Sequence, residues 1–272
     1  MDEKKAAPPP AAGPDPAHSP AETLNMLRAH IDHLERTLAG DVQSVEHAGE
    51  RLLPAWRRAT AGEHRLPVAG LIVIAIVLQL ALPEGLVVKP GWLLPALEAI
   101  VLAGLIAVNP ERINRSSRLV RIMSLTLVAI ICGANAWSAG LLVEELITNS
   151  GIASYDAVAL LGCGAAIYLT NIIVFGLWYW EFDRGGPAAR AQALDPYPDF
   201  LFPQMQEPEL APPDWAPTFL DYLFVSYTNA TAFSPTDTMP LSRWAKGLMF
   251  LQSTVALVSV ALVIARAVNV LK

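Results

Sequence analysis

The 272-residue chain has the composition of a membrane protein, because 53% of its residues are hydrophobic and only 16% are charged. A soluble domain usually carries about 25% charged residues, and here the apolar residues gather in long runs. The formal net charge of −6 gives no reason to expect a nucleic-acid partner. We therefore expect an all-α integral membrane protein whose main partner is the lipid bilayer.

The first 65 residues precede the first apolar run and divide into a tail and a helical region. Residues 1–20 are charged and then rich in Pro and Ala, which predicts a disordered tail and no signal peptide. Residues 21–65 are predicted to form a cytosolic helical region that ends in a basic collar. Within 21–48, apolar residues recur at helical spacing: Leu24, Leu27, Ile31, Leu34 and Leu38. This helix could pack on the protein's own loops, join copies in a homo-oligomer or bind a cytosolic partner.

Four transmembrane helices are predicted between residues 66 and 180. Their apolar runs are residues 66–82, 92–108, 119–142 and 157–180. Arginines precede the first run and fill the link between the second and third, whereas the link 143–156 is acidic. The positive-inside rule therefore predicts a cytoplasmic N-terminus, and the Arg- and Ala-rich composition points to a bacterial inner (plasma) membrane.

A Pro-rich loop is predicted at residues 181–216, directly after an aromatic cluster of Trp178, Tyr179 and Trp180. Aromatic rings with a polar edge are best solvated at the lipid headgroups, so we expect the cluster there. The loop also contains large apolar residues such as Phe200 and Phe202. A fully solvated linker has no need of these, so part of the loop is expected to fold back on the bundle or lie at the interface.

Residues 217–272 are predicted to form a pair of channel-like helices joined by a polar turn. If 217–233 crosses the bilayer, the chain is a bundle of about six transmembrane helices with a cytoplasmic C-terminus. If 217–233 is only a re-entrant half-helix, the chain has five spans and its C-terminus lies outside. The six-span arrangement fits the positive-inside rule better and is the leading expectation.

Glu98 lies inside the second apolar run, where an ionisable group is costly and is therefore a functional hypothesis by default. The plainer interpretation is a neutral or hydrogen-bonded carboxyl that helps helices to pack. The other is a proton- or cation-linked role. The expected hydrogen-bond partners are Asn135, Asn171 and Gln252.

A second group of polar residues interrupts the apolar C-terminal part. The candidates for a polar path or for interhelical contacts are Asp221, Thr228, Asn229, Thr231, Ser234 and Asp237. Asp221 lies one turn into its helix. Asp237 is expected in a turn that caps the last helix, and Thr238 or Ser242 are alternative caps.

The chain offers no constellation typical of an enzyme. All five histidines lie before residue 65, and Glu98 has no second carboxylate at acid/base spacing. Cys132 and Cys163 lie inside apolar runs without the spacing of metal ligands. We therefore expect no enzymatic activity, no cofactor and no metal site.

The C-terminal part contains a series of motifs in one order: Phe219-Leu220-Asp221, Thr228 to Thr231, Asp237, Met239-Pro240-Leu241-Ser242-Arg243 and the run to Val270. This order resembles the end of the pore-loop potassium channel module. Together with the segment 178–187, the chain resembles uncharacterised bacterial multi-span proteins related to that module. The resemblance implies a channel-like ancestor and assembly. It does not imply potassium selectivity, because Thr-Ala-Phe-Ser-Pro stands where the family has its Thr-Val-Gly-Tyr-Gly filter.

Two functions follow as hypotheses. The first is a channel- or transporter-like protein that moves a cation or a small solute along the polar residues of the C-terminal part. The alternative is a non-conducting membrane scaffold or interaction protein that uses the N-terminal helix and the Pro-rich loop.

Overall fold

The computed structural model describes residues 53–108, 110–113, 117–148, 157–232 and 237–270, together with Arg28, Ile31 and His33. The chain divides into two compact units, residues 1–53 and 54–272. In the first unit, Arg28, Ile31 and His33 are helical and exposed. The rest of the predicted tail and N-terminal helix lies outside the described residues.

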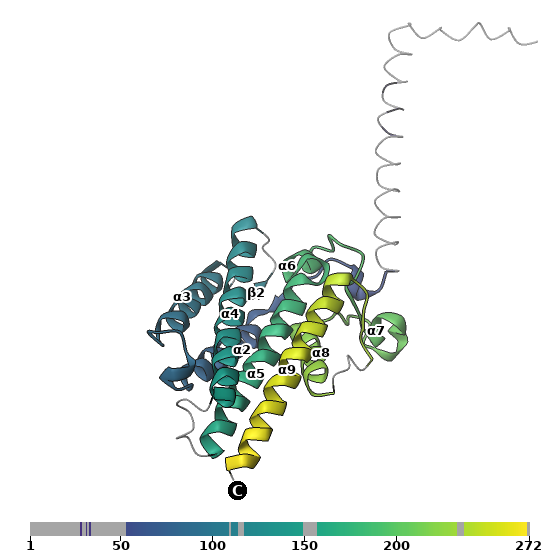
Figure 1. The fold of residues 1–272 in the computed structure, drawn as a ribbon. Helices are drawn as coiled ribbons and strands as arrows, with labels where there is room; N and C mark the ends of the chain where they lie inside the picture. Colours follow the sequence, from purple (N-terminus) through teal and green to yellow (C-terminus); the bar gives the residue numbers. More distant parts are fainter. Residues whose placement is uncertain are drawn as a thin grey trace, which may run out of the picture. The chain divides into compact units, whose positions relative to one another are not determined.

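The second unit is mostly helical (Figure 1). Its α-helices are α2 (Arg65–Leu80), α3 (Leu93–Val108), α4 (Arg118–Thr148), α5 (Ala157–Phe182), α6 (Pro187–Ala191), α7 (Pro203–Gln206), α8 (Phe219–Thr231) and α9 (Arg243–Val270). Its 3-10 turns are η1 (Ala55–Arg57), η2 (Glu84–Leu86), η4 (Asp183–Gly185) and η5 (Pro208–Leu210). Two short antiparallel pairs join β1 (Glu63–His64) to β2 (Arg112–Ile113) and β3 (Phe200–Leu201) to β4 (Met239–Pro240).

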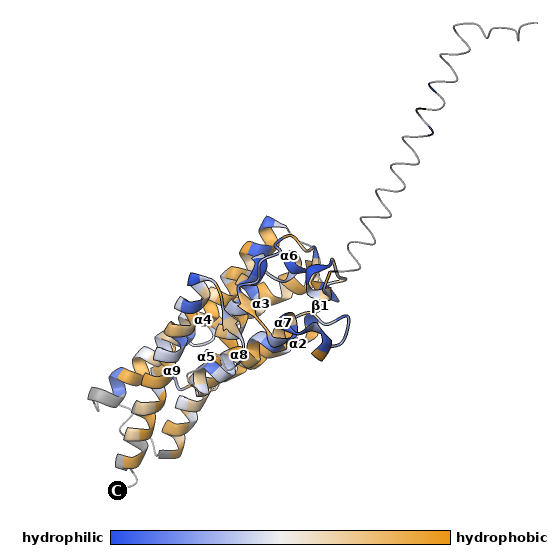
Figure 2. Ribbon diagram, turned by 90° about the vertical axis from the view of Figure 1, so that its right-hand side faces the viewer, coloured by the Kyte–Doolittle hydropathy of each residue, from blue (hydrophilic) through white to orange (hydrophobic). Residues whose placement is uncertain are grey.

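Three helical segments are long and apolar enough to cross a membrane: Arg118–Glu145, Val158–Gly185 and Arg243–Ala265. Helices α2 and α3 are also apolar, but each has 16 residues and is about 24 Å long. Figure 2 shows hydrophobic residues along the helices and hydrophilic residues gathered near α6 and β1. The prediction of a mostly helical chain with membrane-length apolar helices is confirmed in this form.

Helix α5 lies at the centre of the second unit and packs against α2, α4, α8 and α9 (Figure 1). Its inner residues are buried, whereas the surrounding helices leave large apolar side chains exposed. Ile100 on α3 is 69% exposed and Phe250 on α9 is 76% exposed. Apolar outer faces of this extent suit contact with lipid better than contact with water.

The aromatic end of α5 is packed inside the protein. Tyr179 and Trp180 are buried, and their rings contact Phe200 and Phe219 at centroid distances of 5.1 and 5.7 Å. The Pro-rich loop supplies part of this packing, since Phe200, Phe202 and Met205 are all buried. The loop therefore folds back on the bundle, as its apolar residues predict.

Candidate functional site

The start of α8 is fixed by a capping box and by a carboxylate from another segment. Thr218 donates from its backbone N–H and its hydroxyl to Asp221 Oδ2, at 2.7 and 2.9 Å. The N–H of Phe219 donates to Glu63 Oε2 at 2.9 Å. Asp221 therefore acts as a cap at the entrance of its helix, and it satisfies backbone donors that the helix leaves free.

Helices α8 and α9 begin at the same end of the bundle and run side by side in the same direction (Figure 1). Near their starts, Tyr222 of α8 and Trp244 of α9 both pack against Phe200, at centroid distances of 6.2 and 5.8 Å. Deeper in the bundle, Asn229 of α8 bonds to Gln252 of α9, with 2.8 Å between Nδ2 and Oε1. In each pair, the residue of α8 and the residue of α9 lie at a similar distance from the start of their helix, as expected for parallel helices.

The parallel course concerns the segment 217–233, for which the sequence left a full span and a re-entrant half-helix as alternatives. Had the segment 217–233 crossed the bundle, the last helix would begin at the opposite end and run antiparallel to it. Helix α8 instead ends after 13 residues, or about 20 Å. Strand β4 then lies beside β3, next to the start of α9. The chain thus returns to the end of the bundle at which α8 begins, and α9 starts there.

Polar side chains of α5, α8 and α9 form an inner network: Tyr179, Ser226, Asn229, Gln252 and Ser253. Gln252 is fully buried, and its Oε1 accepts from the Tyr179 hydroxyl at 2.6 Å and from Asn229 Nδ2 at 2.8 Å. Its Nε2 donates to Ser226 Oγ at 2.7 Å, and Ser253 Oγ donates to Asn229 Oδ1 at 3.1 Å. The amide of Gln252 is thereby saturated, and the inner network joins α8 to its two neighbours.

The remaining candidates of the C-terminal part lie apart from the inner network. Thr228 and Thr231 each donate their hydroxyl to a backbone carbonyl of α8 itself, at 3.0 and 2.8 Å. Asp237 is exposed, and α9 is capped by Ser242, whose Oγ accepts a backbone N–H at 3.3 Å. Ser234 lies outside the described residues. Among the described candidates of the C-terminal part, Asn229 is thus the one whose side chain links α8 to another helix.

Glu98 is fully buried on α3, and its partner differs from the three expected ones. Gln79 Nε2 on α2 donates to both carboxylate oxygens of Glu98, at 3.2 and 3.1 Å. The expected partner Gln252 is used in the inner network instead. Within the described part of the chain, no lysine, arginine or histidine lies at ion-pair distance from Glu98. The structure therefore does not bring Glu98 together with Asn229.

A charged cluster lies where α8 and α9 begin, and its members are Glu63, Asp183, Arg184, Arg190 and Asp199. Arg190 Nη2 and Glu63 Oε1 form an ion pair at 3.0 Å. Burial disfavours the charge on Arg190, but the nearby oxygens of Tyr222, Glu63 and Asp183 outweigh it and raise the pKa of Arg190. The ion pair fastens the segment before α2 to the segment after α5.

Two aspartates of the charged cluster connect the loop to both C-terminal helices. Asp183 accepts from the Tyr222 hydroxyl at 2.6 Å and from the backbone N–H of Asp199 at 2.7 Å. Asp199 accepts from the Trp244 indole at 2.8 Å and from the backbone N–H of Arg184 at 3.0 Å. The starts of α8 and α9 are therefore held to the end of α5 by two carboxylates, of which Asp183 is buried and Asp199 is partly buried.

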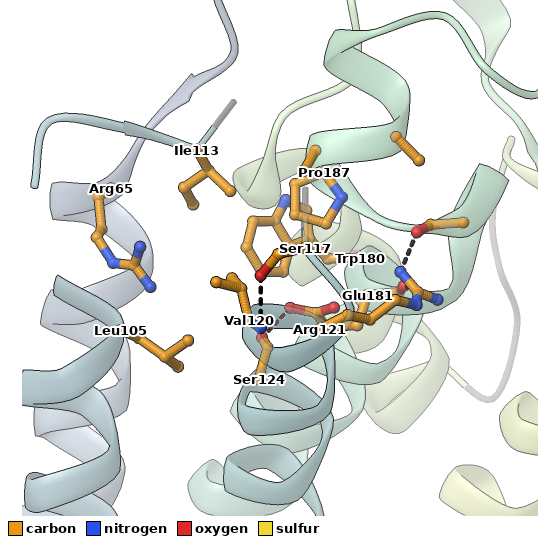
Figure 3. A pocket seen from close by; sticks show the side chains of 13 residues that line it. Arg65, Leu105, Ile113, Ser117, Val120, Arg121, Ser124, Trp180, Glu181 and Pro187 are labelled. Carbon is orange, nitrogen blue, oxygen red and sulfur yellow. Dashed lines mark hydrogen bonds between the residues drawn. The ribbon is translucent and has the colours of Figure 1, made fainter. Parts of the chain in front are cut away.

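A small cavity of about 40 Å³ lies beside the charged cluster, between α2 and α4. Figure 3 shows the side chains that line it. Glu181 is buried at its edge and accepts from the Ser124 hydroxyl. Arg121 donates to the Gly185 carbonyl, and Arg65 faces the cavity from α2. The charged groups Arg121 and Glu181 at its edge thus already have hydrogen-bond partners.

A wider cleft of about 410 Å³ opens next to the first turn of α8. Both apolar and polar groups line it, among them Thr60, His64, Pro67, Arg112, Thr218 and Leu220. Arg112 donates to the Gly62 carbonyl at 2.8 Å and lies 3.0 Å from His64 Nε2. The cleft is large enough for a small molecule or for a side chain of a partner.

Sequence reasoning did not select the charged cluster as a site. One signal was present, because Glu181, Asp183 and Arg184 continue an apolar helical run without a break. Charges in that position must be bonded inside the protein or lie in water. Their partners could not be inferred, since Glu63 and Arg190 are 127 residues apart.

Within the described residues, no group of three or more His, Cys, Asp or Glu side chains is placed to hold a metal ion. No protein-family model matches the chain, and no curated protein and no solved structure matches it. The function is therefore argued from the geometry of α8, the inner network and the charged cluster.

Proposed function

We propose that the chain is a channel- or transporter-like multi-pass protein of the bacterial inner membrane that moves a cation. The observation that carries this proposal is the course of α8, which enters beside α9 and ends partway along it. Asn229 and Ser253 each lie ten residues, about 15 Å, beyond the first residues of their helices. Helix α9 continues for about 25 Å beyond Ser253. In a bilayer the end of α8 would thus lie near the middle of the hydrocarbon core.

A helix end at that depth needs water or protein around it. Its last carbonyls have no partners within the helix, and lipid offers none, so such ends occur where a polar path or a binding site meets them. The carbonyl end of a helix also carries a partial negative charge, which favours a cation. Thr231, in the last turn of α8, is exposed at this position.

The orientation proposed for the protein follows from the arginines near the mouth of α8. Arg65, Arg121, Arg184 and Arg190 all belong to the end of the bundle where α8 begins. The positive-inside rule places this end, and the N-terminus, in the cytoplasm. The chain then has five spans and one re-entrant helix, which leaves the C-terminus outside.

The resemblance to the pore-loop module remains a proposal, and the course of the chain supports it. A short helix, a return segment and a final long helix follow one another as in that module. The outer face of α8 is apolar, with Leu220 and Phe224 exposed, so a second copy of the chain is a suitable neighbour for it. The sequence has no glycine between Gly186 and Gly247, and we propose no potassium selectivity.

Cation flux into liposomes that contain the purified protein tests the proposal. Asn229→Leu is expected to lower the flux about tenfold, because a loss of about 1.4 kcal/mol in holding α8 reduces the conducting arrangement by that factor. Thr254→Val on α9 is the matched control, since its exposed hydroxyl bonds only to its own helix at 2.9 Å. Unchanged flux in Asn229→Leu, with both variants folded, contradicts the proposal.

The second candidate is a non-conducting scaffold or interaction protein, and the saturated inner network favours it. Polar groups that satisfy one another serve packing as well as they serve a path. This candidate predicts no flux of cations or small solutes from folded protein. It also predicts a partner bound at residues 21–48, at the Pro-rich loop or in the cleft beside α8.

A further inference from the structure

A second small cavity lies on the other side of the charged cluster, and it is distinct from the cavity of Figure 3. Its volume is about 40 Å³, and it is formed by the segment before α2, the start of α6 and the chain before α8. Its polar lining consists of Trp56, Arg58, Thr60, Glu63, Arg184 and Arg190. The other lining residues are small or are prolines, which leaves the space open.

Arg184 is a buried cation that has the carboxylates of Asp183 and Asp195 in its surroundings but none within ion-pair distance among the described residues. It is 2% exposed, and its Nε and Nη1 donate to the backbone carbonyls of Asp195 and Trp56, at 2.8 and 2.6 Å. Among the described residues it forms no ion pair, and its Nη2 has no hydrogen-bond acceptor. A buried charge in this state is costly unless something negative or strongly accepting completes it.

Two further buried donors of the same lining lack an acceptor among the described residues: Trp56 Nε1 and Arg190 Nε. Glu63 does not serve them, because its oxygens already accept from Trp180, Phe219 and Arg190. All three unsatisfied atoms are therefore donors, and they come from η1, η4 and α6. A ligand that completes them must be an acceptor with several oxygens.

We propose that this cavity binds a phosphate group, either free phosphate or the headgroup of a phospholipid. A tetrahedral oxyanion offers oxygens in several directions, which suits donors that come from three separate segments. The volume corresponds to about three water-sized positions, which is enough for one phosphate group. Arg184 lies at the end of the candidate membrane span Val158–Gly185. Free phosphate from the water and a phospholipid headgroup from the membrane surface can both reach such a position.

The backbone at Arg184 has an unusual conformation. Arg184 has φ of 50°, in the left-handed region that is unfavourable for a residue with a side chain. Gly185 and Gly186 follow with φ of 78° and 95°. This turn lets Arg184 donate its backbone N–H to Asp199 while its side chain reaches Trp56. Strain of this kind is found where the position of a side chain matters for function.

The test measures binding of inorganic phosphate to the full chain in neutral detergent by isothermal titration calorimetry. Trp56→Phe removes one unsatisfied donor and keeps an aromatic ring, so the free protein is expected to stay as stable as wild type. Its affinity for phosphate is expected to fall about tenfold, the usual effect of losing a hydrogen bond to a charged group. Arg184→Gln is expected to abolish binding, and the exposed Arg118→Gln is the control.

Phospholipid that stays with the protein through purification, measured by native mass spectrometry, forms the second arm. Retention that Trp56→Phe and Arg184→Gln reduce, and Arg118→Gln does not, assigns the site to a lipid headgroup. Phosphate binding with the same pattern and no selective retention assigns it to free phosphate. Failure of wild type to bind either one at about 10 mM overturns the proposal, and so does equal binding in all three variants. Cation flux is not part of this readout, so the two proposals fail separately.

Discussion

The inner network and the charged cluster both contact α5, but they differ in whether their buried polar groups have hydrogen-bond partners. The inner network is built from amides and hydroxyls, and Gln252 satisfies all of its hydrogen-bonding groups there. The charged cluster contains an ion pair and saturated carboxylates, but it leaves donors of Arg184 and Arg190 unsatisfied. A saturated neutral network fixes helices in place, whereas unpaired donors in a charged one are costly, which is the basis of the phosphate site proposed above.

The largest effect expected from this comparison is on stability at Glu63. Glu63→Ala removes the acceptor of Arg190, of the Trp180 indole and of the Phe219 backbone. The pair is largely buried, with side chains 6% and 16% exposed, and breaking it by deleting one partner is expected to cost about 3 kcal/mol. Thermal unfolding in detergent, followed by tryptophan fluorescence, measures the loss. Glu84→Ala, at an exposed carboxylate of η2, is expected to be neutral.

A smaller loss is expected in the inner network. Gln252→Leu removes the partner of the Tyr179 hydroxyl and one partner each of Asn229 and Ser226, which is expected to cost about 2 kcal/mol. The same unfolding assay compares it with Thr254→Val, which should be near wild type. A larger loss of stability in Gln252→Leu than in Glu63→Ala would contradict the expected order of the two regions.

The smallest effect tests the backbone that supports the charged cluster. A Cβ added at Gly186 would lie 2.5 Å from Arg121 Nη1 and 2.9 Å from the Glu181 carbonyl oxygen. Its φ of 95° is also unfavourable for alanine. Gly186→Ala is therefore expected to cost about 1.5 kcal/mol in the same assay. Gly162→Ala on α5 meets nothing within 4 Å and is expected to be neutral or slightly stabilising, so equal losses would contradict this account.

The long helices could be predicted from the sequence with close boundaries. The run 157–180 became α5, and the run 92–108 became α3, which ends before Pro110 because the residue before a proline disfavours helix. Hydropathy reports the length of an apolar segment and not its direction. The parallel course of α8 and α9 therefore became visible only from the contacts of Asn229 and Trp244.

The roles of the candidate residues could likewise be predicted only in part. Asn229 was selected as a costly amide, and it does bond across helices. Asp221 was selected for its charge, and it caps its own helix. Glu98 was expected to meet Asn135, Asn171 or Gln252, but α2 supplies Gln79 instead. Sequence spacing identifies which polar groups are costly, and only the packing of the helices decides which of them meet.

The return of the chain to the start of α9 has a practical consequence for the Pro-rich loop. Strand β3 is paired to β4 on one side of the loop, and Phe219 is bonded to Glu63 on the other. Between these anchors, residues 206–210 are continuously exposed. An epitope or a protease site inserted there would report which face of the membrane the loop occupies, without loosening either attachment. If a protease cuts the chain there, the two fragments are expected to stay associated.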